Sequence, residues 1–112
     1  MSNVIDVGTL ESLAEIMGDD MGMLLETYID DCSGKVTSIC EMNLATQQDD
    51  IFKMAHSLKG SSNNVGATEF ADYCAEVERL ARAGSLTDND FNPETIQSFF
   101  ERAVNELKTY YL

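Results

Sequence analysis

Apolar residues recur at intervals of three and four along most of the chain, which predicts amphipathic helices rather than strands. The longest stripe predicts a helix that begins after Asp19 and Asp20 and runs to about Thr46, with Gly34 tolerated inside it. A stripe rich in methionine can line a binding groove, but core packing is the simpler interpretation. Its apolar positions are Met21, Leu25, Tyr28, Cys32, Val36, Ile39 and Met42.

A shorter stripe near the N-terminus predicts a brief first helix after a lead of residues 1–8. Thr9 is its expected N-cap, and Gly18 is its expected end. A helix of this length is not stable alone in water, so we expect it to cover one end of a larger bundle. Its apolar positions are Leu10, Leu13, Ala14 and Met17.

Two helices joined by a short turn follow a polar break. The first should begin at Asp49 or Asp50, either of which would cap it, and end near Asn64, with Gly66 in the turn. Because the turn is short, the helix after it must be an antiparallel neighbour of the helix before it.

The remaining two helices complete the pattern. One should begin around Ala67 or Thr68, with Thr68 a candidate cap, and close at Gly84; its inner face holds Phe70, Tyr73, Cys74, Val77, Leu80 and Ala81. The last begins at residues 92–94, where an asparagine cap is followed by a proline and an acid. Its expected inner face holds Ile96, Phe99, Phe100, Ala103, Leu107 and Tyr110. The pattern therefore predicts an all-α protein, and 112 residues are enough for one domain, residues 1–112, with one core.

The charge of the chain limits its partners. It carries 20 acidic and 7 basic residues, a net charge of −13. This disfavours DNA, RNA and anionic membrane surfaces. No apolar run approaches the ~20 residues that span a bilayer, and the N-terminus lacks the layout of a secretory signal. We expect a cytoplasmic protein that binds neither nucleic acid nor membrane.

The three cysteines, Cys32, Cys40 and Cys74, do not suggest a metal site. Their number is odd, they form no C-x-x-C pair, and the chain has a single histidine. Reduced thiols in or near the core are the better interpretation. A Cys–His nucleophilic pair is a remote alternative.

The single histidine, His56, lies in the third predicted helix. At ~100° per residue, His56 points ~140° away from the apolar stripe of that helix and should face outward. Four residues share its side of the helix: Phe52, Lys59, Gly60 and Asn63. The apolar stripe itself consists of Ile51, Met54, Ala55, Leu58, Ser62 and Val65.

This arrangement suits phosphoryl chemistry. An imidazole is largely deprotonated near neutral pH and can accept and release a phosphoryl group. Lys59 could pair with the incoming negative charge. Gly60 weakens a helix by ~1 kcal/mol relative to Ala, which suggests that something must approach closely there. Ser61 is small and Asn63 is polar. An isolated histidine is more often an ordinary surface residue, and this alternative stays open on the residues alone.

Glu78 could reach His56 from the next helix. His56 lies ten residues, or ~15 Å, before Gly66, and Glu78 lies about as far beyond the turn. Glu78 would then bind an imidazole N–H and leave the other nitrogen free. The alternative is that Glu78 pairs with Arg82 four residues later on a solvated face.

Several segments resemble the histidine-containing phosphotransfer (HPt) domain family. The main one is the run His56-x-Leu58-Lys59-Gly60, followed by the turn at residues 65–67. The segment 4–20 and the run 74–80 are also similar to that family, so the resemblance covers nearly the whole chain. It implies an antiparallel up-down-up-down four-helix bundle with a short additional N-terminal helix.

The resemblance also implies a role in multistep two-component phosphorelays. His56 would accept a phosphoryl group from a receiver-domain aspartate and pass it to another response regulator. Lys59 would stabilise the phosphoryl group, Glu78 would orient the imidazole, and Phe52, Gly60, Ser61 and Asn63 would contact the partner. The expected partners are receiver domains and a hybrid sensor histidine kinase. The protein would be a monomeric carrier rather than an enzyme, with no cofactor of its own, and Mg²⁺ would belong to the receiver.

Three other functions fit the residues less well. A histidine-kinase dimerisation domain usually has an acid directly after its reactive histidine, whereas Ser57 follows His56. A simple protein-binding bundle would make His56 incidental. A small hydrolase or metal protein lacks the necessary ligands and second base. The initial Met1 suggests a free-standing protein, although a domain cut from a hybrid kinase would look the same.

Overall fold

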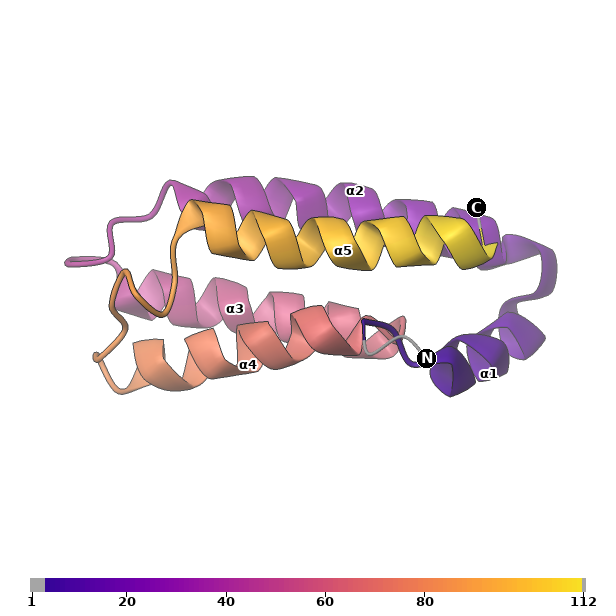
Figure 1. The fold of residues 1–112 in the computed structure, drawn as a ribbon, viewed down its shortest axis with the longest axis horizontal. Helices are drawn as coiled ribbons and strands as arrows, with labels where there is room; N and C mark the ends of the chain where they lie inside the picture. Colours follow the sequence, from indigo (N-terminus) through magenta and orange to yellow (C-terminus); the bar gives the residue numbers. More distant parts are fainter. Residues whose placement is uncertain (1–3, 112) are drawn as a thin grey trace.

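The computed structural model describes residues 4–111, so the predicted lead is seen from Val4 onward, and over this range the fold is all-helical. Figure 1 shows α2 lying beside α5, α3 lying beside α4, and α1 at one end of the molecule. The helices are α1 (Val7–Met17), a 3₁₀ turn η1 (Gly18–Asp20), α2 (Met21–Cys40), α3 (Gln48–Asn64), α4 (Thr68–Arg82) and α5 (Pro93–Tyr111).

The core is formed by the apolar stripes that the periodicity predicts, together with residues outside the helices, among them Val4, Ile5, Leu86 and Phe91. Tyr28 and Ser62, the polar side chains inside it, satisfy each other through a hydroxyl–hydroxyl hydrogen bond of 2.7 Å between α2 and α3. One predicted core position is wrong: Tyr110 lies near the end of α5 and its side chain is 52% exposed. The largest fully buried side chains include Leu10, Leu25, Ile39, Ile51, Leu58, Phe70, Ile96 and Leu107.

Helix α2 ends at Cys40, six residues earlier than the apolar pattern predicts. Asn43 explains the early end. Its side-chain Oδ1 accepts hydrogen bonds from the backbone N–H groups of Ala45 (2.8 Å) and Thr46 (3.1 Å), and its own N–H donates to Gln47. An asparagine side chain that satisfies the local backbone competes with helix continuation and favours a turn.

Two predicted caps are wrong, one by three residues and the other by one residue. Thr9 lies inside α1, and the N-cap is Asp6, whose carboxylate accepts from the Gly8 N–H (3.1 Å) and the Thr9 hydroxyl (2.7 Å). The hydrogen bond from Thr9 lowers the pKa of Asp6 below its usual value. In α4, Thr68 is the first helical residue rather than the cap, and Ala67 holds the cap position without a side-chain hydrogen bond.

The other two helix starts are close to prediction. Helix α3 begins at Gln48, so Asp49 and Asp50 lie in its first turn rather than at the cap. Acids there face the positive end of the helix dipole. In α5, Asn92 is the cap as expected, and its Oδ1 accepts from the Thr95 N–H at 3.0 Å.

The N-terminal segment is docked on the turn between α3 and α4. The Asp6 N–H donates to the Gly66 carbonyl (2.8 Å), and the Glu69 N–H donates to the Val4 carbonyl (3.2 Å). Gly66 has φ +75°, and a Cβ there would lie 3.0 Å from the Asp6 carbonyl oxygen. Both the conformation and the close approach therefore require glycine. This contact anchors the turn that sets α3 against α4.

Within residues 4–111, no helix combines the length and the apolar character needed to cross a bilayer. The same part of the chain contains no group of three or more His, Cys, Asp or Glu side chains arranged to hold a metal ion. The three cysteines are free thiols, with Cys32 and Cys74 buried and Cys40 half-buried.

Candidate functional site

Helix α3 places His56 on the outside of the bundle, as the helical periodicity predicts. Its side chain is 65% exposed, whereas Ala55 and Leu58 beside it are buried. The apolar stripe turns inward against the core, so the opposite face of α3 must carry the imidazole in solvent.

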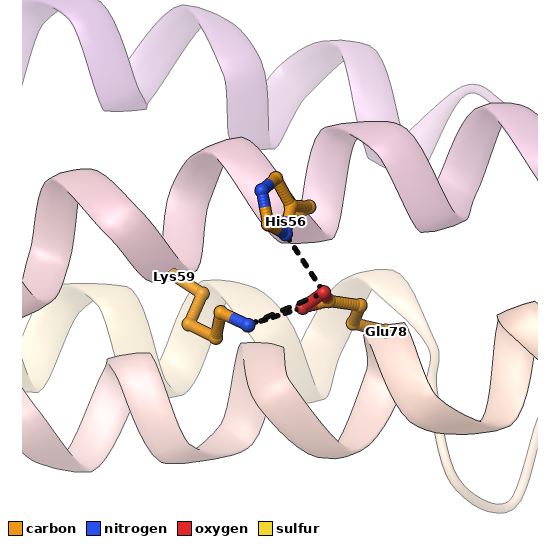
Figure 2. A network of polar contacts seen from close by, with 3 residues as sticks. All are labelled: His56, Lys59 and Glu78. Atoms are coloured by element: carbon orange, nitrogen blue, oxygen red, sulfur yellow. Dashed lines mark hydrogen bonds and ion pairs between the residues drawn. The ribbon is translucent and has the colours of Figure 1, made fainter.

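Glu78 of α4 meets both His56 and Lys59. Its Oε2 lies 2.9 Å from His56 Nδ1, and the ammonium group of Lys59 donates to its Oε1 at 2.6 Å and its Oε2 at 3.3 Å. Figure 2 shows His56 and Lys59 extending from α3 toward the same carboxylate. Glu78 pairs with these residues and, within the described chain, makes no ion pair with Arg82. The packing thus decides between the two alternatives that the sequence left open.

The environment of Glu78 keeps its carboxylate ionised. Its side chain is only 12% exposed, and this burial raises its pKa, but the hydrogen bonds from Lys59 and His56 outweigh burial and leave the pKa below its usual value. An ionised carboxylate is only an acceptor, so the Nδ1 atom of His56 must carry the hydrogen of the shared bond. In the neutral imidazole, Nε2 then holds the free lone pair.

An aromatic ring and a cation extend the site along α3 and α4. The Phe52 ring centroid lies 6.4 Å from that of His56, with the planes 31° apart. The guanidinium carbon of Arg82, the last residue of α4, lies 5.8 Å from the Phe52 centroid on its face. Phe52 is half-buried against the core, so it gives Arg82 a firm apolar support.

Gly60 and Asn63 are exposed, and Ser61 is half-buried, farther along α3 from His56. A Cβ at Gly60 would meet nothing within 4 Å. The backbone at this position is therefore open to an approaching molecule. The structure brings His56, Lys59 and Glu78 into direct contact, places Phe52 next to them, and leaves Gly60, Ser61 and Asn63 as a neighbouring surface.

Comparison with known proteins agrees with this geometry. A family model for the Hpt domain matches residues 23–109. The crystal structure of histidine-containing phosphotransfer protein B (HptB) from Pseudomonas aeruginosa PAO1 is similar, with a TM-score of 0.88 and 31% sequence identity over 97% of this chain and 95% of that chain. No curated protein sequence gives a significant match. The chain belongs to the Hpt domain family.

The expected family resemblance is thus confirmed, and the role of this Hpt domain is histidine phosphotransfer in phosphorelays. Hpt domains are phosphocarriers rather than catalysts. They work with receiver domains and histidine kinases of two-component relays.

One contact to the helix that carries His56 in this Hpt domain is not predicted by the sequence. Lys35 of α2 donates from Nζ to the hydroxyl of Ser57 at 2.9 Å, and it also pairs with Asp31 at 3.0 Å. Ser57 directly follows His56. Nothing in the local sequence around Lys35 points to this contact, because it depends on the register between α2 and α3.

The other cations near the site differ in whether a carboxylate already neutralises them. Lys53 pairs with Asp49 on its own helix, and Arg79 pairs with Glu76 on its own helix. Arg82 has no carboxylate partner within the described residues, and its guanidinium lies over the Phe52 ring. It is therefore the uncompensated positive charge at the site of this Hpt domain.

Proposed function

We propose that His56 is the phosphoryl carrier of this Hpt domain. It accepts the group from the aspartyl phosphate of one receiver domain and passes it to the aspartate of another response regulator. The observation that carries the proposal is the hydrogen bond of 2.9 Å between His56 Nδ1 and Glu78. This bond leaves Nε2 as the nucleophilic nitrogen on an imidazole that is exposed to a partner.

The transfer step uses the atoms of the site as follows. The Nε2 lone pair attacks the phosphorus of the aspartyl phosphate, an N–P bond forms, and the P–O bond to the aspartate breaks with its electron pair leaving on the carboxylate. The hydrogen on Nδ1 stays on the ring, bonded to Glu78. As the ring becomes cationic, the Glu78 carboxylate stabilises it, which is the electrostatic assistance expected of a preorganised acceptor. The onward transfer runs the same steps in reverse.

Lys59 would stabilise the arriving phosphoryl oxygens. It is one helical turn from His56, and its side chain is 31% exposed, so its ammonium group can turn from Glu78 toward a group on Nε2. Its charge matters in a chain of net charge −13, which otherwise repels an anionic group.

The partner completes the site. We expect the receiver domain to supply Mg²⁺ and most of the catalysis, as is usual where phosphoryl transfer depends on electrostatics. Its loops would contact Phe52, Gly60, Ser61 and Asn63, and a hybrid sensor histidine kinase would supply the phosphoryl group upstream. The working unit would be a monomer, residues 1–112 in one domain, with α2 to α5 in an antiparallel up-down-up-down bundle and α1 as the additional short helix.

Transfer of a radiolabelled phosphoryl group from purified receiver domains tests this proposal. We expect acid-labile label on the wild type and none on His56→Gln, because a phosphoramidate bond is lost in acid whereas a phosphoserine survives. The chain has no second histidine, so label that resists acid, or label that persists in the variant, would contradict the assignment. A protein-binding bundle without phosphotransfer would leave the variant as active as the wild type.

A further inference from the structure

Most basic residues of this strongly acidic chain lie on the helix that carries His56 or on its two neighbours, α2 and α4. Seven residues are basic, and all but two of them lie on α3 or on the helices packed against it; the exceptions, Arg102 and Lys108, lie on α5. Charges farther away than the Debye length of ~10 Å at 0.1 M salt are largely screened. A partner that docks at His56 therefore senses the charges close to it rather than the net charge of −13. Four of the five cations on α2 to α4 are paired with carboxylates. The five are Lys35, Lys53, Lys59, Arg79 and Arg82.

Arg82 is the member of this group that no carboxylate neutralises. An open hollow of about 280 Å³ beside the Glu78–Lys59 pair is lined by Lys59, Ala75, Glu78, Arg79 and Arg82. Within this hollow, Glu78 pairs with Lys59. Arg79 pairs with Glu76, which does not line the hollow. The guanidinium of Arg82 has no such partner within the described residues. It lies over the Phe52 ring, and that ring lies beside the imidazole of His56.

We propose that Arg82, held over the Phe52 ring, is a docking residue that binds an acidic side chain of the receiver domain as that domain approaches His56. The inference rests on the proposed function, because a domain that bears an aspartyl phosphate presents an anionic surface. Charge complementarity selects this partner: the hollow offers a surplus of one positive charge, and the ring restrains the guanidinium before binding. Preorganisation of this kind reduces the entropy lost on association.

Lys108 provides a matched control for Arg82. Both are exposed bases without a carboxylate partner in the described part of the chain, but Lys108 lies on α5 beside Glu26, Ile29 and Asp30, away from the His56 contacts. Arg82→Glu and Lys108→Glu change the net charge equally. Any difference between them therefore reports the position of the charge rather than its amount.

The experiment measures phosphoryl transfer from a receiver domain that labels the wild type, at receiver concentrations well below saturation. At low salt we expect Arg82→Glu to slow transfer by ~10-fold, Lys108→Glu by less than ~2-fold, and Arg82→Lys to keep most of the rate, because rim charges act mainly on association. The deficit of Arg82→Glu should shrink as salt rises. Equal rates for the two glutamate variants would overturn the proposal, as would a deficit that is insensitive to salt.

Direct labelling with the small donor phosphoramidate separates docking from chemistry. Arg82→Glu should lose less of its labelling rate with this donor than with the receiver domain, because no protein surface has to dock. A matching loss with this donor would show that Arg82 acts on the imidazole itself and would overturn the docking role. If the wild type takes label neither from phosphoramidate nor from any receiver domain, the proposed function fails, and the docking role fails with it. Circular dichroism of each variant confirms folding.

Discussion

At the scale of single residues, the central feature is that one carboxylate serves two partners. Glu78 accepts from the imidazole through Oε2 and from Lys59 through both of its oxygens. The same bonds that hold Lys59 near the site also keep Glu78 ionised and the hydrogen on Nδ1. The tautomer of the His56 ring and the position of Lys59 are thus coupled through a single side chain.

Glu78→Gln should remove a contribution to stability that depends on pH. The pKa of Glu78 is lowered from 4.5 in the folded protein because the bonds from Lys59 and His56 outweigh its burial. Its stabilising contribution is therefore fully present above the unfolded pKa and is lost as pH falls through the folded pKa. We expect the variant to be less stable by about 1 kcal/mol near neutral pH, a modest value because its partners are partly exposed.

Urea unfolding between about pH 3 and pH 7 measures this effect. The difference in stability between the two proteins should shrink as pH falls through the folded pKa of Glu78. Glu76→Gln is the matched control, because Glu76 is a paired but exposed carboxylate on the same helix and should matter less. A difference between wild type and Glu78→Gln that stays constant with pH would contradict the ionised state of Glu78.

Gly60→Ala should separate stability from function. A Cβ at Gly60 meets nothing within 4 Å, so alanine should stabilise α3 by roughly 0.5–1 kcal/mol. If a receiver approaches closely there, the same methyl group should slow phosphoryl transfer. Gly34→Ala in α2 is the control, because it also meets nothing within 4 Å and should stabilise without slowing transfer. Unchanged transfer in Gly60→Ala would remove Gly60 from the docking surface.

At the scale of helices, the short turn between α3 and α4 sets the register on which the site depends. Residue counting from Gly66 predicts that His56 and Glu78 lie at similar distances from the turn, and the 2.9 Å contact between them confirms it. The docked N-terminal segment holds this turn in place, because the Asp6 N–H donates to the Gly66 carbonyl. A distant part of the chain therefore supports the geometry at His56.

Gly66→Ala should destabilise this turn severely. Alanine in a left-handed conformation costs ~1–2 kcal/mol, and its Cβ would also lie 3.0 Å from the Asp6 backbone oxygen. Gly84→Ala supplies the control, because Gly84 has φ +70° but no atom within 4 Å of the added Cβ. Thermal unfolding should show a larger loss for Gly66→Ala than for Gly84→Ala. Equal losses would show that the contact with Asp6 contributes nothing.

At the scale of the whole molecule, the helices close one core that shields two of the three thiols. Burial raises the pKa of Cys32 to about 11 and raises the pKa of Cys74 still further. Burial also raises the pKa of Cys40, which is only half-buried. The thiolate is the reactive form of cysteine. A buried thiol with a raised pKa should therefore react only when the bundle opens.

The three thiols should therefore react at different rates under native conditions. We expect Cys40 to react first with a disulfide reagent, and Cys32 and Cys74 to react together and slowly, because they become accessible only when the core opens. Mass spectrometry of partly modified protein measures the order, and Cys40→Ser leaves only the slow phase. Addition of urea should accelerate that phase. Rapid reaction of Cys32 or Cys74 in native buffer would show that the core opens locally.

The sequence by itself determined the helices, the outward direction of His56 and the family, because all three depend on short-range spacing. Helical periodicity assigns each side chain to a face without reference to the rest of the chain. Periodicity does not say where a helix stops or where its neighbours stop covering it. Helix α2 ends early because the Asn43 side chain bonds the local backbone, and Tyr110 is exposed because it lies near the end of α5.

Only the tertiary structure decided which charges meet. Glu78 could pair with Arg82 on its own helix or with His56 and Lys59 across the α3–α4 interface, and packing selects the second arrangement. The contact of Lys35 with Ser57 and the place of Arg82 over Phe52 likewise need two helices in a particular register. That register is set by side chains that interlock from distant segments, and no local pattern in the sequence encodes it.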